Sequence, residues 1–182
     1  MHGLLALRVP ASARDTVGWF RWLSPEPDLT RSDLVFFTDG SALDSAVTEI
    51  AAIGFAIVVA TRSGDLVAWG WGRPPSFVTD SAMAEAWAVY TVLSLTLAPP
   101  PIYTDCLGLL RTAEGGTTAA TVASAAAARV WHMIAGCLDG DVTPLRQEDV
   151  LDWLPAHQSY HIIGDRLTAA GKEVTSVQWR AN

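Results

Sequence analysis

The sequence predicts an α/β fold, in which helices lie on the faces of a mixed β-sheet. Apolar stretches rich in Val, Ile and Phe are bounded by turn residues, which is typical of strands. A short turn joins two of these stretches and makes them an antiparallel hairpin. Helical segments separate the later strands, as they do in parallel sheets. The expected order is three antiparallel strands followed by two parallel strands.

Length and composition allow one packed domain. The chain has 182 residues, of which 50% are hydrophobic and 17% are charged, so a full core can be buried. Residues 1–31 contain Pro10, Pro25 and Pro27, and we expect them to be an N-terminal extension or linker. This segment either docks through its aromatic cluster at 19–22 or forms a disordered lead-in. Residues 32–182 are expected to form the domain.

The first three strands are expected at 34–37, 51–60 and 66–72. The unbroken apolar run at 34–37 predicts a strand that is buried on both faces, and Gly40 is expected to end it. A turn at 62–65 joins the second and third strands. In the third strand, Trp69 and Trp71 share one face because side chains alternate along a strand.

Helices and two short strands are expected to follow. Asp80 or Ser81 can cap a helix that continues to about Leu97, before three prolines end it. Strands are expected at 102–104 and 150–154, and an alanine-rich helix at 119–138. Residues 158–182 are polar and carry no clear pattern.

Two of the predicted strands end with the same dipeptide, Thr38-Asp39 and Thr104-Asp105. If these strands are parallel neighbours, both carboxylates lie at the sheet edge where α/β proteins bind ligands. Glu85 lies in an apolar part of the intervening helix, where a buried carboxylate requires a partner. Taken singly, such an Asp is most often a turn residue, and such a Glu most often interacts with the helix dipole.

Together, the three carboxylates predict a cation site. They cannot all stay ionised close together without a counter-charge, so at least one pKa should be raised. Mg²⁺ prefers carboxylate oxygens, and Mn²⁺ is a second possibility. The cluster fits a site for two metal ions about 4 Å apart that cleaves at phosphorus.

Charge and cysteine content exclude other classes. The formal net charge is −7 and Lys172 is the only lysine, so the chain has no broad basic patch for nucleic acid. Cys106 and Cys137 have no zinc or disulfide spacing, which favours an intracellular setting in the cytoplasm or nucleus. No segment has the length of a membrane span or a signal peptide.

Several of these segments together resemble the ribonuclease H family. The segments are Leu34-Val35-Phe36-Phe37-Thr38-Asp39-Gly40-Ser41, the strand at 51–60, Ala84-Glu85-Ala86-Trp87-Ala88-Val89, Ile102-Tyr103-Thr104-Asp105-Cys106 and the stretch from Asp149 to His157. The resemblance covers about residues 33–182. It implies a ribonuclease H-like mixed sheet and hydrolysis of the RNA strand of an RNA–DNA hybrid with two Mg²⁺ ions.

The resemblance also implies roles for particular residues. Asp39, Glu85 and Asp105 would bind the metal ions and act in catalysis. His157 would help to move protons or to release product. The backbone at Gly40 and Ser41 would approach the RNA, whose 2′-hydroxyl distinguishes it from DNA. The parent protein would be of the retroelement type or a diverged relative, with an adjacent reverse-transcriptase-type domain as a further partner.

The sequence also departs from the family pattern. The family has a fourth carboxylate on a last helix, and here the candidates are Asp165 or a residue beyond Asn182. We therefore expect the last helix to be missing and the domain to be truncated at its C-terminus. One alternative is a catalytically impaired domain that binds nucleic acid or protein. Another is a different nuclease or an integrase of the same broad fold.

Overall fold

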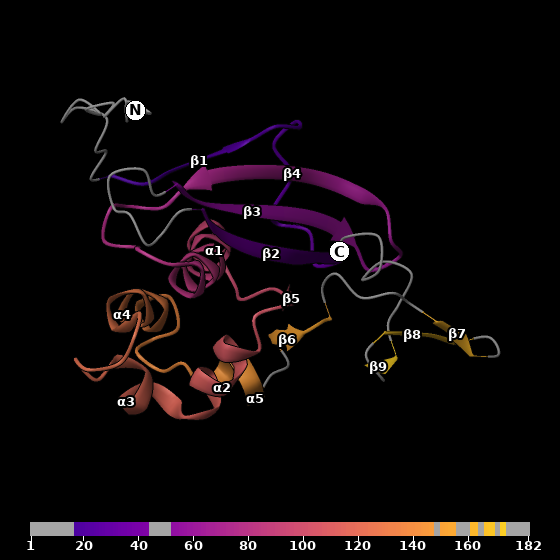
Figure 1. The fold of residues 1–182 in the computed structure, drawn as a ribbon. Coiled ribbons are helices and arrows are strands. Elements are labelled where there is room, and N and C mark those ends of the chain that lie inside the picture. The colour runs from indigo at the N-terminus through magenta and orange to yellow at the C-terminus, as the bar shows by residue number, and fades with distance from the viewer. Residues whose placement is uncertain are drawn as a thin grey trace, which may run out of the picture.

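The chain forms a six-stranded sheet, with helices packed against it (Figure 1). The computed structural model describes residues 17–43, 52–147, 150–155, 161–163, 166–169 and 172–173. In chain order the elements are β1 (Trp19–Trp22), β2 (Leu34–Leu43), β3 (Ala52–Thr61), β4 (Leu66–Arg73), α1 (Ser81–Leu95), β5 (Ile102–Thr104), α2 (Leu107–Glu114), α3 (Gly116–Thr121), α4 (Ala128–Gly136), α5 (Pro144–Gln147), β6 (Leu151–Trp153), β7 (His161–Ile163), β8 (Arg166–Ala169) and β9 (Lys172–Glu173).

The sheet confirms the predicted mixture of strand directions. Its order is β1-β4-β3-β2-β5-β6. β2, β3 and β4 pair antiparallel, whereas β5 is parallel to both β2 and β6. The expectation that Gly40 ends the first strand is wrong, because β2 continues to Leu43. Its last residues stay paired with β3, down to Leu43 opposite Ala52, so their backbone groups remain in the ladder.

The aromatic cluster at 19–22 docks on the sheet as the edge strand β1, which pairs antiparallel with β4. Phe20 and Trp22 pack on the main core. They lie opposite Gly72 and Gly70, where an added Cβ would come within 2.7 Å of Phe55 Cζ or of Phe20 Cζ, respectively. The two glycines therefore give the aromatic rings room to cross the strand.

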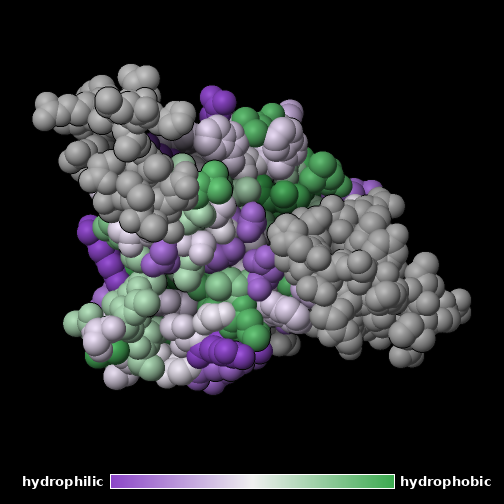
Figure 2. Space-filling view, in the orientation of Figure 1, coloured by the Kyte–Doolittle hydropathy of each residue, from purple (hydrophilic) through white to green (hydrophobic). Residues whose placement is uncertain are grey.

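The two faces of the sheet are packed differently. Leu34 and Phe36 belong to the main core, together with the buried residues of the helices. Val35 and Phe37 alternate with them and belong to a smaller cluster that contains no helical residue among the described ones. β2 is thus buried on both faces, as its apolar run predicts. Outside, hydrophobic and hydrophilic side chains intermingle on the visible surface (Figure 2).

Helix α1 covers the centre of the sheet and carries one of the candidate ligands (Figure 1). Of the two expected caps, Asp80 is the N-cap, and its side chain accepts a 2.8 Å hydrogen bond from the Met83 backbone N–H. The helix ends at Leu95, slightly before the expected Leu97.

The prediction of a single helix at 119–138 is wrong. The structure has two helices, α3 and α4, because Val122 is extended and Ala127 has a left-handed φ of 61°. Neither conformation continues an α-helix. The β-branched Thr121 and Val122 lower helix propensity at the break. The break lets α3 and α4 pack against each other and bury both Ala120 and Val130.

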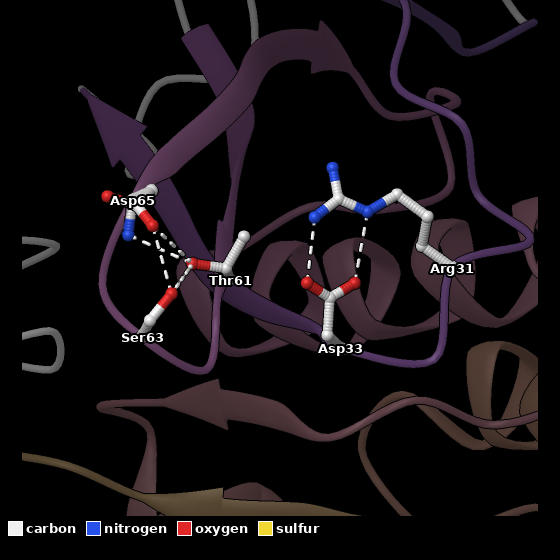
Figure 3. A network of polar contacts seen from close by, with 5 residues as sticks. All are labelled: Arg31, Asp33, Thr61, Ser63 and Asp65. Atoms are coloured by element: carbon white, nitrogen blue, oxygen red, sulfur yellow. Dashed lines mark hydrogen bonds and ion pairs between the residues drawn. The ribbon is translucent and has the colours of Figure 1, made fainter.

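A polar network holds the turn between β3 and β4 (Figure 3). The Thr61 hydroxyl accepts a 3.0 Å hydrogen bond from the Asp65 backbone N–H, and Ser63 donates a 2.9 Å bond to the Asp65 carboxylate. Nearby, Arg31 pairs with Asp33 through two hydrogen bonds of 2.7 and 3.0 Å.

The strands β7, β8 and β9 form a separate antiparallel sheet, in a region where the sequence carries no clear pattern. Within the described ranges, every helix is too short or too polar to cross a membrane.

Candidate metal centre

Asp39 and Asp105 are brought together by the parallel pairing of β2 with β5. In this pairing Thr38 lies opposite Thr104, so the aspartate that follows each threonine occupies an equivalent place at the end of the paired segment. Both threonines are buried, at 5% and 0% exposure, whereas Asp39 is exposed and Asp105 is half-buried. The repeated Thr-Asp dipeptide thus places a fixed hydroxyl inside the sheet and a carboxylate at its edge.

Glu85 joins the two aspartates because α1 lies unusually close to β2. A Cβ added to Gly40 would lie 2.3 Å from the Glu85 backbone N and 2.6 Å from the Ala84 carbonyl carbon. Only glycine allows this approach. The backbone N–H of Gly40 also donates a hydrogen bond to the Glu85 carboxylate. Gly40 therefore positions Glu85 by its lack of a side chain and by its amide.

The three carboxylates form one cluster. Each offers an oxygen atom, and these atoms all lie within 4.8 Å of one another. Glu85 is only 5% exposed, and its burial raises the pKa of that carboxyl to about 8. This value also includes the charges of Asp105 and Asp39, which raise the pKa, and hydrogen bonds from Gly40 and Thr104, which lower it. The expected raised pKa therefore belongs to Glu85, and desolvation is its main cause.

Two further residues fix the cluster, and sequence reasoning did not assign them a role. The Thr104 hydroxyl lies 3.4 Å from Glu85 Oε2, and it accepts a 3.1 Å hydrogen bond from the Cys106 backbone N–H. The Trp153 indole N–H donates a 2.8 Å bond to the Asp105 carbonyl. The sequence signal for Thr104 was the repeated Thr-Asp pair. Trp153 gave no such signal, because its contact depends on the pairing of β5 with β6.

The donor set fits a hard divalent cation. All three side chains offer carboxylate oxygens, which Mg²⁺ and Mn²⁺ accept, and none offers the thiolate or imidazole that zinc prefers. A bound cation would supply the counter-charge that the buried Glu85 lacks. The residues present therefore fit the group that the sequence predicts.

Comparison with known proteins gives structural matches only. No family model matches the sequence, and no curated protein matches it. The N-terminal RNase H domain of Rv2228c from Mycobacterium tuberculosis, solved as a fusion with maltose-binding protein, is 12% identical, with a TM-score of 0.44; the match covers 69% of this chain and 84% of that one. The PFV RNase H domain, solved in solution, is 20% identical, with a TM-score of 0.44. This match covers 69% of the present chain and 79% of the PFV domain.

The strand directions are those that the sequence resemblance implies: three antiparallel strands, β2, β3 and β4, are followed along the chain by the parallel β5 and β6. The chain has a ribonuclease H-like fold. Within this ribonuclease H-like domain, the cluster lies where the parallel pairing of β2 and β5 ends.

The other expected site residues of the ribonuclease H-like domain are placed only in part. Gly40 and Ser41 follow Asp39 on β2, and Ser41 is exposed beside the cluster. His157 and Asp165 lie outside the described residues, so their expected roles stay predictions.

Proposed function

We propose that this chain is a metal-dependent endonuclease that hydrolyses the RNA strand of RNA–DNA hybrids. One observation carries the proposal. Three carboxylates from three different elements, Asp39 on β2, Glu85 on α1 and Asp105 after β5, offer oxygen atoms within 4.8 Å of one another. Such a cluster costs stability unless a cation binds to it.

Two divalent ions, Mg²⁺ or Mn²⁺, would activate the attacking water and stabilise the leaving oxygen when bound. Asp39 and Asp105 would hold these ions from the exposed side of the cluster. Glu85 would hold them from the buried side, where Gly40 and Thr104 fix its carboxylate by hydrogen bonds.

The remaining expected residues would act on the substrate. The exposed hydroxyl of Ser41 can form a hydrogen bond with a ribose 2′-hydroxyl, which would favour the RNA strand over DNA. The backbone at Gly40 would approach the RNA on the face of β2 that α1 does not cover. His157 would move a proton at the reacting phosphate, since imidazole is the side chain that both gains and loses a proton near neutral pH.

A cleavage assay tests the proposal. A hybrid labelled on its RNA strand is incubated with the chain and Mg²⁺, beside duplex RNA and duplex DNA of the same sequence. We expect cleavage of the RNA in the hybrid only, and a loss of at least about 100-fold in rate for Asp39→Asn, Glu85→Gln and Asp105→Asn. Asp139→Asn is the matched control, because Asp139 is an exposed acid remote from the cluster in sequence. No cleavage by the parent chain, or equal loss in the control, would contradict the proposal.

A second candidate function is a binding module with impaired catalysis. It is favoured by the number of acids, because the cluster found among the described residues contains three carboxylates, whereas the family pattern has four. This candidate predicts that the parent chain binds the hybrid and a divalent ion but leaves the RNA intact. The same assay therefore separates the two functions when binding is measured beside cleavage.

A further inference from the structure

The sheet has an aromatic and cationic surface at its β1 edge. Phe20 and Trp22 of β1 pack on the core, so the alternate side chains of this strand lie on the opposite face of the sheet. The same alternation applies to β4 from Ala68 onward, where the buried Ala68, Gly70 and Gly72 alternate with the exposed Trp69, Trp71 and Arg73. We name the resulting surface the Trp–Arg face, and it consists of Trp19, Arg21, Trp69, Trp71 and Arg73.

Aromatic rings and cations alternate on the Trp–Arg face. Trp19 and Trp71 pack edge to face, with ring centroids 4.7 Å apart, yet they stay 38% and 42% exposed. In the pairing of β1 with β4, Arg21 lies opposite Trp71 and Arg73 lies opposite Trp19. No salt bridge within the described ranges involves either arginine. The face therefore offers flat apolar rings beside positive charges that have no acidic partner there.

The Trp–Arg face continues from the acidic cluster across the sheet. Strand register places Asp39 opposite Ala56 of β3, and Ala56 opposite Trp71 of β4. These residues form one row, so Asp39 and Trp71 are separated by two strand spacings, or about 10 Å between backbones. A ligand strand that crosses the sheet along this row would reach the rings within one or two nucleotides of the cluster.

Between the acidic cluster and the tryptophan rings, the sheet surface is formed by small residues of β3. Gly54 and Ala56 are the β3 residues in the rows of Ser41 and Asp39, and neither has a side chain larger than a methyl group. A Cβ added to Gly54 would lie 3.7 Å from the Ser41 hydroxyl oxygen, so Gly54 and Ser41 share this face. Small residues here leave space for a ligand between the acidic side and the aromatic side.

The chemistry of the Trp–Arg face fits unpaired nucleotides. Indole rings stack on bases that are not already stacked and paired in a duplex, and arginine binds phosphate. The chain as a whole is acidic, with a net charge of −7, so two arginines that have no salt bridge to a described residue give this face a local preference for a polyanion. A protein partner would also use exposed tryptophans and arginines, so self-association through this face is one of the outcomes that the test separates from nucleic-acid binding.

We propose that the Trp–Arg face binds a single-stranded RNA or DNA segment that extends from the hybrid at the acidic cluster. The inference rests on the proposed function for the position of the paired part, and it names the substrate class as a hybrid with an unpaired flank. Stacking on Trp19 and Trp71 supplies the affinity, and Arg21 and Arg73 bind the phosphates of the flank.

Binding measurements without cleavage test this proposal. Fluorescence anisotropy in EDTA compares a blunt hybrid with the same hybrid carrying RNA or DNA extensions at either end. The readout is the dissociation constant of the blunt hybrid divided by that of the extended hybrid. Each variant is therefore compared with its own binding to the blunt hybrid. For the parent chain we expect at least one extension to tighten binding on the order of 10-fold.

Variants of the Trp–Arg face should lose the tighter binding of the extended hybrid. In Trp19→Ala/Trp71→Ala the ratio should fall to near one, while Trp71→Phe should keep part of it because an aromatic ring remains. Arg21→Gln/Arg73→Gln should reduce the ratio and lower the salt slope of extension binding by about 1.4, at about 0.7 per phosphate contact. Arg62→Gln/Arg111→Gln, which changes two exposed arginines elsewhere, should retain the parent ratio. The arginine variant tests the idea even if the tryptophan variant fails to fold.

Three results would overturn the inference. In the first, no extension tightens binding of the hybrid to the parent chain. In the second, the ratio of dissociation constants stays at the parent value in both double variants. In the third, sedimentation shows that the parent chain self-associates and that Trp19→Ala/Trp71→Ala abolishes this self-association. These outcomes are distinct from failure of the proposed function. A parent chain that shows the ratio but cleaves nothing contradicts the nuclease alone, and one that cleaves but lacks the ratio contradicts the Trp–Arg face alone.

Discussion

Glu85 is the residue whose chemistry the fold changes most. It is 5% exposed, and burial together with two neighbouring aspartates raises the pKa of its carboxyl to about 8. At neutral pH and without a cation, Glu85 therefore holds a proton that an exposed glutamate would have lost. A divalent ion would have to displace this proton, so cation binding and the protonation of Glu85 are linked.

The raised pKa of Glu85 predicts that the free energy of unfolding falls as pH rises from about 4.5 to about 8. In this window the unfolded chain has released the proton and the folded chain retains it, so each pH unit costs up to about 1.4 kcal/mol. Urea unfolding of the metal-free chain at several pH values measures the effect. Glu85→Gln, which cannot ionise, should show a flatter profile and should be at least as stable as the parent at pH 8.

The difference between the two stability profiles is the informative quantity, because groups remote from the acidic cluster titrate equally in both proteins. A parallel pair of curves would mean that Glu85 is already ionised in the folded chain. A strongly destabilised Glu85→Gln at every pH would mean that the carboxylate has a structural role that an amide cannot fill.

At the scale of elements, the position of the cluster depends on the close approach of α1 to β2. Gly40→Ala should lower the free energy of unfolding by about 3 kcal/mol, since its Cβ would lie 2.3 Å from the Glu85 backbone N and rigid backbone must move. The same shift should weaken Mg²⁺ binding, measured by calorimetry. Gly136→Ala is the matched control, because a Cβ there meets nothing within 4 Å, and it should be neutral or stabilising by up to about 1 kcal/mol. Equal stability of both variants would show that α1 can retreat without cost.

The N-cap of α1 gives a second prediction at this scale. Asp80→Ala removes the acceptor of the Met83 N–H and should cost about 1 kcal/mol in the free energy of unfolding. Asp80→Asn keeps an acceptor oxygen in the same place and should lose only a few tenths of that amount. Urea unfolding of the two variants checks this. If Asp80→Asn loses as much as Asp80→Ala, charge rather than the capping bond is responsible.

Elements with strong local patterns were predictable from the sequence, and those fixed by distant partners were not. The apolar run of β2 and the cap of α1 are local signals, and both were expected. β1 is only four residues long in a proline-rich segment, and it is a strand because β4 offers Gly70 and Gly72 opposite its large rings. The break between α3 and α4 likewise reflects tertiary packing, which overrides the helix propensity of the alanines.

At the scale of the whole molecule, cation binding should stabilise the fold. Mg²⁺ at about 100 times its dissociation constant adds about 2.7 kcal/mol, which for a domain of this size raises the Tm by roughly 5–10 °C. Differential scanning calorimetry measures the shift, with KCl at matched ionic strength as the control for screening. Asp39→Asn and Glu85→Gln should lose most of it. An equal shift in KCl would mean that the gain comes from general screening of the acidic chain.

Much of the candidate site could also be predicted from the sequence, because its three acids stand next to recognisable elements. The two Thr-Asp pairs predicted the meeting of Asp39 and Asp105, and the register of Thr38 with Thr104 explains it. For Gly40, the sequence predicted an approach to the RNA but not the close contact with α1. Its close approach to α1 depends on the path of the helix over the sheet, which sequence patterns do not contain.

The parallel pairing of β2 with β5 has a consequence for the time course of folding. The hairpins β2–β3 and β3–β4 join neighbouring segments, whereas the Thr38 hydroxyl meets the Tyr103 carbonyl across 65 residues of chain. Long-range pairings of this kind form slowly, since a large loop must close first. We therefore expect the hairpins to form early and the acidic cluster to be assembled late. A cation that recognises only the assembled cluster would then leave the folding rate nearly unchanged and slow unfolding.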